Sequence, residues 1–190
     1  TFFLKGVGNS FSKIYVGAYG VGNAPIISGA EILQNPSWQN ENINGINTIK
    51  TLFADTACFV YADGAFNQLA RFPDDHFLFV DNVINNGSFA LCGKTYPRDS
   101  VIVSDSLKNI TMDDLTDAYV NLRTSGWNIA TFKAISFDKP TGTLAMHSSS
   151  YGWSINLTVH NNASEKYGFF LSNRKEFLSQ PSEFWVDNIN

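Results

Sequence analysis

The chain has 190 residues, of which 44% are hydrophobic and only 16% charged, and its formal net charge is -4. This length and apolar content suit one domain with a substantial core. The 13 Lys and Arg residues are scattered along the chain, so the clustered positive charge that holds nucleic acid or an anionic membrane is missing. We therefore expect no nucleic-acid binding, and the lack of any run of about 18 apolar residues predicts no membrane insertion.

The dominant pattern along the chain has a period of two, and Val, Ile, Phe and Tyr are prominent in it. Such segments are typical of β-strands, and the Gly, Asn, Asp and Pro residues between them favour turns. The expected strands are 13–19, 47–53, 57–62, 76–84, 100–105, 128–137, 142–147, 153–160, 167–172 and 183–189. About ten short strands with such turns predict an all-β fold, an antiparallel β-sandwich or β-barrel.

Two segments between the expected strands are assigned differently. The polar stretch 35–45, NPSWQNENING, is predicted to be an exposed loop because Pro and Gly punctuate it. One short covering helix is predicted over about residues 112–123, with Thr111 as its cap. The apolar residues at the spacing of one helical face are Leu115, Ala118, Tyr119 and Leu122.

The domain organisation is predicted to be simple. A cut at the 35–45 loop would leave too few residues before it for an independent core, so 1–190 is expected to be a single β-rich domain. Because the sequence starts at Thr1 without a Met, we expect a fragment of a longer chain. Cys58 and Cys92 both lie in strand-like runs; buried thiols are favoured, and a disulfide between them stays open.

The sequence carries no motif that names a reaction. The G-x-S-x-G nucleophile pattern is absent, and His76, His147 and His160 do not stand at ligand spacing from one another. The stretch 73–76, PDDH, is ordinary turn chemistry, and the scattered carboxylates cannot be paired by spacing as a glycosidase requires. We therefore expect no enzymatic activity, no metal site and no cofactor.

Aromatic residues beside amides and hydroxyls give some support for binding. Sugars are held by an aromatic face against their C–H groups and by planar amides on their hydroxyls. Two stretches, 35–42 and 147–156, combine these residue types. The candidate ligand-binding residues are Trp38, Ser149, Ser150, Tyr151, Trp153 and Asn156. Trp38 is flanked by polar residues and is expected to be exposed, whereas Trp153 begins a strand, where a core role and an exposed role both stay open.

In overall character the chain resembles receptor-binding domains of viruses and phages, namely capsid-spike heads and tail-fibre tips. The likeness covers the whole chain and rests on short strands, many Asn, Ser, Gly and Phe residues, little Lys, and aromatic-polar loops such as HSSSYGWS at 147–154. The resemblance implies a β-sandwich or β-barrel head, homo-oligomeric assembly as a dimer or trimer, and a cell-surface glycan or protein receptor. It assigns no individual site residue.

The expected function is attachment by a non-enzymatic spike or fibre head, placed on a virion surface or otherwise extracellular. Apolar residues on outward faces would then lie at a subunit interface. The alternative is a carbohydrate-binding module or adhesin domain of a bacterial surface protein or polysaccharide-degrading enzyme. A third hypothesis, from another class, is a hydrolase that acts on polysaccharide with scattered acids.

Overall fold

The computed structural model describes residues 21–22, 30–53, 57, 59–91, 94–124, 126, 128–148 and 164–187, with the backbone alone for 85–91, 94–99 and 148. The chain divides into two compact units, Thr1–Pro36 and Ser37–Asn190. Every strand that the structure describes lies in the second unit. The prediction of one domain over 1–190 stays a prediction.

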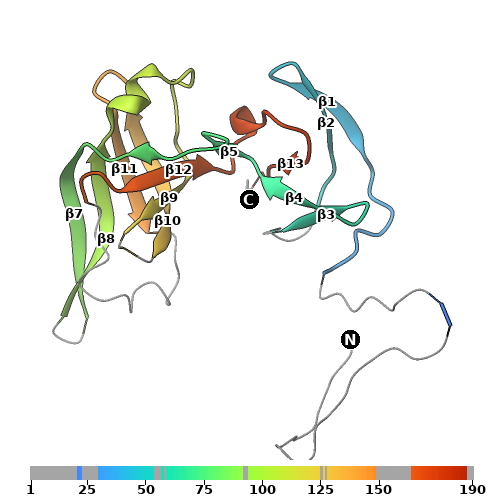
Figure 1. Cartoon of the computed structure of the whole chain (residues 1–190), viewed down its shortest axis with the longest axis horizontal. Coiled ribbons are helices and arrows are strands. Elements are labelled where there is room, and N and C mark those ends of the chain that lie inside the picture. The colour runs from blue at the N-terminus through green and yellow to red at the C-terminus, as the bar shows by residue number, and fades with distance from the viewer. Residues whose placement is uncertain are drawn as a thin grey trace, which may run out of the picture. The chain divides into compact units, whose positions relative to one another are not determined.

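The all-β prediction is confirmed, because the described residues form mainly antiparallel sheets and contain no α-helix (Figure 1). The strands are β1 (Gln39–Ile43), β2 (Ile46–Lys50), β3 (Val60–Ala62), β4 (Ala65–Leu69), β5 (Arg71–Phe72), β6 (Leu78–Phe79), β7 (Asn82–Leu91), β8 (Lys94–Val103), β9 (Tyr119–Arg123), β10 (Ile129–Asp138), β11 (Thr143–Ser148), β12 (Gly168–Ser172) and β13 (Glu183–Phe184). Two short 3-10 turns are also present, η1 (Asp105–Asn109) and η3 (Lys175–Phe177). Within these described residues no helix is long and apolar enough to cross a membrane.

Most of the expected strands coincide with observed ones. Eight of the ten overlap β2, β3, β6 with β7, β8, β10, β11, β12 and β13, in chain order. The remaining two, 13–19 and 153–160, lie outside the described residues. Period-two patterning therefore located the sheets well, because a half-buried strand must alternate its side chains between core and solvent.

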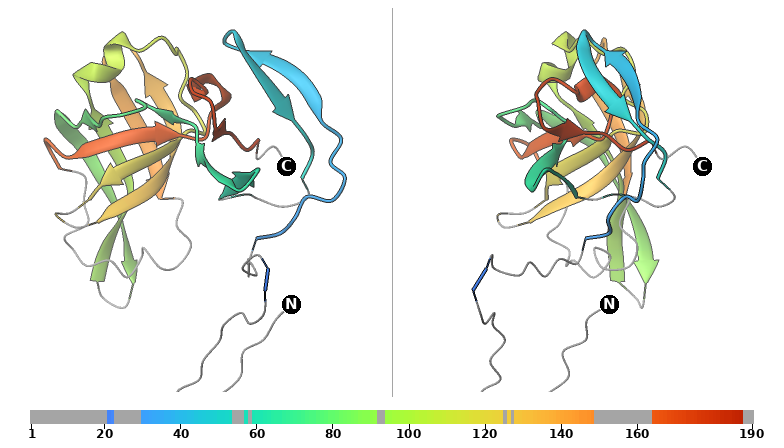
Figure 2. Two further views of the ribbon diagram at one scale, coloured as in Figure 1. Left: turned by 45° about the vertical axis from the view of Figure 1, so that its right-hand side comes forward. Right: turned by 90° about the vertical axis from the view of Figure 1, so that its right-hand side faces the viewer.

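The largest sheet has eight strands and closes on itself. Its ladder runs β5-β12-β9-β10-β11-β8-β7, and β6 also pairs with β12. At Val80 the N–H bonds to the carbonyl of Tyr167, next to β12, whereas the N–H of Asp81 bonds to the carbonyl of Val103 in β8. The segment that leads into β7 therefore lies between β12 and β8, which makes this sheet a barrel; Figures 1 and 2 show its strands curving around a common centre.

The barrel interior is filled by alternate residues of its strands. In β9, β11 and β12 the residues that are completely buried stand two apart, at Val120 and Leu122, Leu144 and Met146, and Phe169 and Leu171. Burial of each such side chain stabilises the fold by about 1.5–3 kcal/mol.

The predicted helix over 112–123 is wrong. Residues up to Ala118 form turns, and Tyr119–Arg123 is strand β9, which pairs with β10 on one side and β12 on the other. Ala118, Val120 and Leu122 are all fully buried, so the effective period here is two. Pairing on both edges outweighs the weak helical spacing, because tertiary context overrides local propensity. The carboxylate of Asp114 accepts a bond from the N–H of Thr116 at 2.8 Å and so forms a turn instead of a helix start.

The predicted loop over 35–45 is wrong from Gln39 onward, because these residues form strand β1 and both turn residues of a hairpin with β2. The central residues Asn44 and Gly45 have φ of 52° and 83°. The β3–β4 hairpin has the same design, with Asp63 and Gly64 at φ of 51° and 77°. Positive φ at both central residues is the type I′ geometry that Asn-Gly and Asp-Gly favour.

Candidate ligand-binding face of the β1–β2 hairpin

One face of the β1–β2 hairpin is exposed and rich in amides. The strands pair with Asn40 opposite Ile49 and Asn42 opposite Asn47, and all four residues are exposed. Side chains opposite one another in an antiparallel pair lie on the same face. Asn40, Asn42, Asn47 and Ile49 therefore form one continuous exposed surface, which we call the amide face together with Trp38.

Trp38 extends this face at the open end of the hairpin. It directly precedes β1, and the two-residue period of an extended chain assigns it to the side of Asn40 and Asn42. It is 52% exposed, as its polar neighbours in the sequence predict. An exposed indole thus adjoins the strand that carries the amides, and its role in binding stays a prediction.

Two hydrogen bonds hold the amides near the turn. The Asn42 Nδ2 atom donates to Asn47 Oδ1 at 3.0 Å, and the N–H of Gly45 donates to Asn42 Oδ1 at 3.1 Å. The Asn42 side chain is therefore fixed from both ends. Within the described part of the chain, no hydrogen bond engages the Asn40 side chain or the Asn47 Nδ2 atom, so these groups can bond to a ligand.

The opposite face of the hairpin carries its charges and its buried contact. Lys50 Nζ lies 2.9 Å from Glu41 Oε2, and both residues alternate away from the amide face. Ile43, on this same opposite face, belongs to the main hydrophobic core. The hairpin is therefore amphipathic, and its exposed amide face contains no charged side chain.

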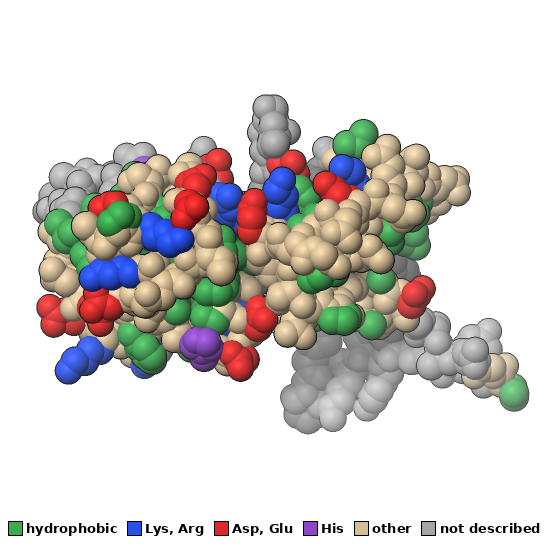
Figure 3. Space-filling model, turned by 90° about the horizontal axis from the view of Figure 1, so that it is seen from above, with side chains coloured by type: hydrophobic (Ala, Val, Ile, Leu, Met, Phe, Trp, Pro, Cys, Tyr) green, Lys and Arg blue, Asp and Glu red, His purple; other side chains and the backbone are tan. Residues whose placement is uncertain are grey.

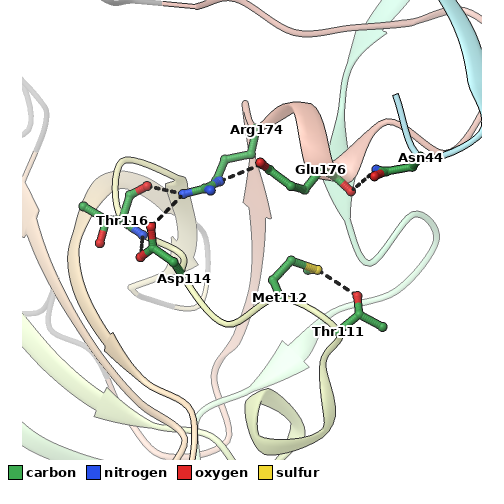
Figure 4. A network of polar contacts seen from close by, with 7 residues as sticks. All are labelled: Asn44, Thr111, Met112, Asp114, Thr116, Arg174 and Glu176. Carbon is green, nitrogen blue, oxygen red and sulfur yellow. Dashed lines mark hydrogen bonds and ion pairs between the residues drawn. The ribbon is translucent and has the colours of Figure 1, made fainter. Parts of the chain in front are cut away.

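The tip of the hairpin is linked through Glu176 to a half-buried arginine, Arg174 (Figure 4). Asn44 Nδ2 donates to the backbone carbonyl of Glu176 in η3 at 3.1 Å. The Glu176 carboxylate accepts a bond from Arg174 Nε at 2.9 Å, and the Arg174 guanidinium also donates to the carbonyl of Thr116. Arg174 thereby joins η3, the 111–118 segment and, through Glu176, the hairpin turn.

The pKa values of the two acids next to Arg174 are both lowered, partly by the arginine. The pKa of Asp114 is lowered, first by the hydrogen bond from the N–H of Thr116 and further by Arg174, whose Nη1 lies 3.7 Å from its carboxylate. Burial raises the pKa of Glu176, but hydrogen bonds from Arg174 and from its own backbone outweigh this effect, so its pKa is lowered overall. Both acids are therefore charged at neutral pH and balance Arg174.

The other predicted binding residues cannot be compared with this face. Ser149, Ser150, Tyr151, Trp153 and Asn156 lie outside the described residues, as do Cys58 and Cys92. Sequence reasoning missed Asn40, Asn42 and Asn47 because it read 35–45 as a loop. The Asn-Gly pair followed by the alternating run from Ile46 was the signal that predicts a hairpin here.

An open hollow of about 300 Å³ lies elsewhere, lined by Phe72, Pro73, Asp74, Asp75, His76 and Gln180. Asp74 accepts bonds from Ser179 Oγ and Gln180 Nε2, and a hydrogen bond from His76 at 2.7 Å lowers the pKa of Asp75. The acids are thus engaged in local pairs. Across the described residues no three His, Cys, Asp or Glu side chains are grouped as a metal site.

A second exposed surface, which sequence reasoning also missed, lies on the β3–β4 hairpin. The rings of Phe59 and Tyr61 both contact Phe66, with centroids 6.2 Å and 5.6 Å apart, and each residue is more than half exposed. We call these three residues the aromatic patch. The run ACFVYA at 57–62 gave no hint of it, because an apolar run reads as buried strand.

The face of the molecule in Figure 3 carries acidic and basic side chains interspersed, with no large area of one sign. No family model matches this chain, and no curated protein or solved structure matches it. Function must therefore be argued from the amide face and the aromatic patch themselves.

Proposed function

We propose that this chain is a non-enzymatic attachment domain, of the kind found in viral capsid spikes and phage tail-fibre heads, that binds a host-surface glycan or protein receptor. The amide face is the single observation that carries the proposal. It combines one exposed indole, Trp38, with a row of outward amides on a rigid hairpin. The proposed place of action is the virion surface or another extracellular location.

The chemistry of this face suits a sugar. An indole ring stacks against the C–H groups of a pyranose, and Ile49 adds apolar contact at the neighbouring position of the same face. Each amide offers two donors and one acceptor oxygen, which match hydroxyls that are both donors and acceptors. Because Asn42 is already fixed by Asn47 and Gly45, little side-chain entropy is lost there on binding.

The proposal includes assembly into a dimer or trimer through the aromatic patch. β3 is the outer strand of the described three-stranded sheet β13-β4-β3, and residues 59–62 carry no charge. Edge strands are usually protected by charge or proline, and a neutral edge pairs with an identical strand without repulsion. A second copy of this chain is therefore the proposed occupant of the patch.

A glycan array tests the binding proposal directly. Trp38→Ala is expected to lower binding of the best glycan at least tenfold, which corresponds to about 1.4 kcal/mol. Phe79→Ala is the matched control, because Phe79 lies in β6 of the barrel and is 56% exposed against 52% for Trp38. Equal binding by the wild type and Trp38→Ala would refute the assigned face.

The alternative is a carbohydrate-binding module or adhesin domain, which would use the same amide face. Light scattering, which measures the mass of the protein in solution, distinguishes the two hypotheses. A stable dimer or trimer supports the spike or fibre head, and a monomer supports the module or adhesin. Incubation with polysaccharides tests the third hypothesis, and any shortening of the chains would overturn the non-enzymatic proposal.

A further inference from the structure

We infer that the ligand of the amide face is an uncharged oligosaccharide and not an acidic glycan. This inference rests on the proposed attachment function and narrows it from glycan or protein receptor to one chemical class. Three properties of the face carry it: its lack of charge, its unused amide groups and its length.

The first property is charge. The residues that alternate onto the amide face are Trp38, Asn40, Asn42, Asn47 and Ile49, none of them ionisable. The neighbouring cation, Lys50, is on the opposite face, where it pairs with Glu41 at 2.9 Å. A carboxylate or sulfate of an acidic sugar would lose hydration here without gaining the charge-assisted bond that usually offsets the loss.

The second property is the hydrogen-bonding capacity that the fold leaves unused. Among the described residues, Asn47 Nδ2 and the whole Asn40 side chain make no hydrogen bond, while Asn42 is occupied on both of its polar atoms. The available groups include both donors and an acceptor. Neutral sugar hydroxyls need this mixture, whereas a carboxylate uses donors alone.

The third property is the length of the face. Trp38 and Asn42 are four residues apart, which at about 3.4 Å per residue corresponds to about 14 Å. That span is longer than a single sugar ring. A ligand that stacks on Trp38 and also reaches the Asn42–Asn47 pair must therefore contain more than one sugar unit.

The experiment compares matched pairs of glycans on the full chain, each pair identical except for a terminal acid, such as lactose and sialyllactose. We expect the neutral member of a pair to bind at least fivefold tighter, and its affinity to change less than about twofold between about 50 mM and about 500 mM NaCl, because no ion pair is screened. Trisaccharides should bind tighter than the corresponding monosaccharides.

Two variants sharpen the result. Asn47→Ala removes the unused donor and should weaken the neutral glycan several-fold. Ile49→Lys places a cation in the middle of the face, so it should shift preference toward the acidic member of each pair and introduce salt dependence. If Ile49→Lys shows the same preference for neutral over acidic glycans as the wild type, the charge argument is contradicted.

The outcomes separate the inference from the function beneath it. Binding that prefers acidic glycans and is lost in Trp38→Ala overturns the inference and leaves the attachment function and its site in place. Binding that ignores Trp38→Ala overturns the site and the inference together. Host-cell attachment without any glycan binding keeps the function through a protein receptor and overturns the inference.

Discussion

The β1–β2 and β3–β4 hairpins are built on one turn design and expose opposite kinds of surface. Both turn at a pair of residues with positive φ, Asn44-Gly45 and Asp63-Gly64. The first hairpin exposes a single indole with a row of amides, whereas the second exposes three aromatic rings in mutual contact. A shared backbone design thus sets the shape, and the outward side chains decide which partner can bind.

The hairpins also differ in how they are held. The tip of the first is tied by one side-chain bond, from Asn44 to the carbonyl of Glu176. The second continues into the barrel at β5, and the end of β4 pairs with β13 through backbone bonds from Gln68 N–H to the Ser182 carbonyl at 2.9 Å and from Ala70 N–H to the Phe184 carbonyl at 2.8 Å. The first hairpin therefore depends on side-chain chemistry and the second on backbone pairing.

The largest expected effect on the proposed self-association concerns the aromatic patch. Phe59→Asp and, separately, Phe66→Asp put a charge among the rings, so each should raise the dissociation constant of the oligomer at least tenfold, about 1.4 kcal/mol. Sedimentation over a concentration series measures this change. Because Phe66 lies in a strand and Phe59 does not, agreement between the two variants excludes misfolding of the hairpin as the cause.

Ile135→Asp is the matched control for the patch, since Ile135 is a similarly exposed residue of β10 in the barrel. It should leave association unchanged. Glycan binding per subunit should also persist in both patch variants, because the amide face is on the other hairpin. An oligomer that resists both substitutions would contradict the proposed interface.

The next effect concerns Arg174. Replacing it with Met removes the bonds to Glu176 and to the Thr116 carbonyl and leaves two acids without their cation, so stability should fall by about 2 kcal/mol. Denaturant unfolding measures the loss. Lys133→Met is the control, because the Lys133–Asp117 pair at 2.7 Å is well exposed and its loss should cost less than about 0.5 kcal/mol.

The pH dependence of stability in acid is a second, independent test of the role of Arg174. The pKa values of Asp114 and Glu176 are lowered in the folded protein. The two carboxylates therefore stabilise the fold at pH values above their unfolded-state pKa of about 4, and this stabilisation is lost as the pH falls through their folded-state pKa values. Both carboxylates are partly exposed, which limits the total to less than about 1 kcal/mol. In Arg174→Met this decline below about pH 4 should become shallower, whereas an unchanged slope would show that Arg174 does not set these pKa values.

The sequence predicted the sheets because burial in a barrel imposes a local alternation. It failed at 112–123, where Leu115, Ala118 and Leu122 fit a helical face and Ala118, Val120 and Leu122 fit a strand equally well. Only the pairing of β9 with β10 and β12 decides between them, and that pairing is a long-range property. Barrel closure at Val80 and Asp81 is equally invisible in sequence, since it depends on backbone groups of distant residues.

For the candidate site, the exposure of Trp38 followed from its polar neighbours, because a lone indole between Ser and Gln has no apolar segment to join. The amides beside it did not follow, since face assignment needs the register of the hairpin. The aromatic patch was harder still. Nothing in 57–62 distinguishes an apolar strand that is covered from one that is exposed.

A smaller effect concerns the turn glycines. An added Cβ at Gly45 or Gly64 meets no atom within 4 Å, so only the positive φ is penalised, by about 1 kcal/mol for alanine. Gly45→Ala should weaken glycan binding and leave association intact, and Gly64→Ala should do the reverse. Paired binding and sedimentation measurements on both variants test whether the two surfaces are independent; a joint loss in either variant would show that they are coupled.

The smallest expected effect exchanges the first turn residues. Asn44→Asp gives the first hairpin the Asp-Gly turn of the second, keeps a residue that tolerates positive φ, and replaces the Nδ2 donor by an oxygen facing the Glu176 carbonyl. This contact is exposed, so the loss should be only about 0.5 kcal/mol in thermal unfolding, with a small decrease in glycan affinity. Asp63→Asn is the reverse exchange and should be neutral, because no side-chain hydrogen bond of Asp63 is found in the described part of the chain.

Equal effects of the two exchanges would mean that Asn44 acts only as a turn former. Unequal effects would mean that its side chain holds the amide face in place, which is the difference between the hairpins on which the binding proposal depends.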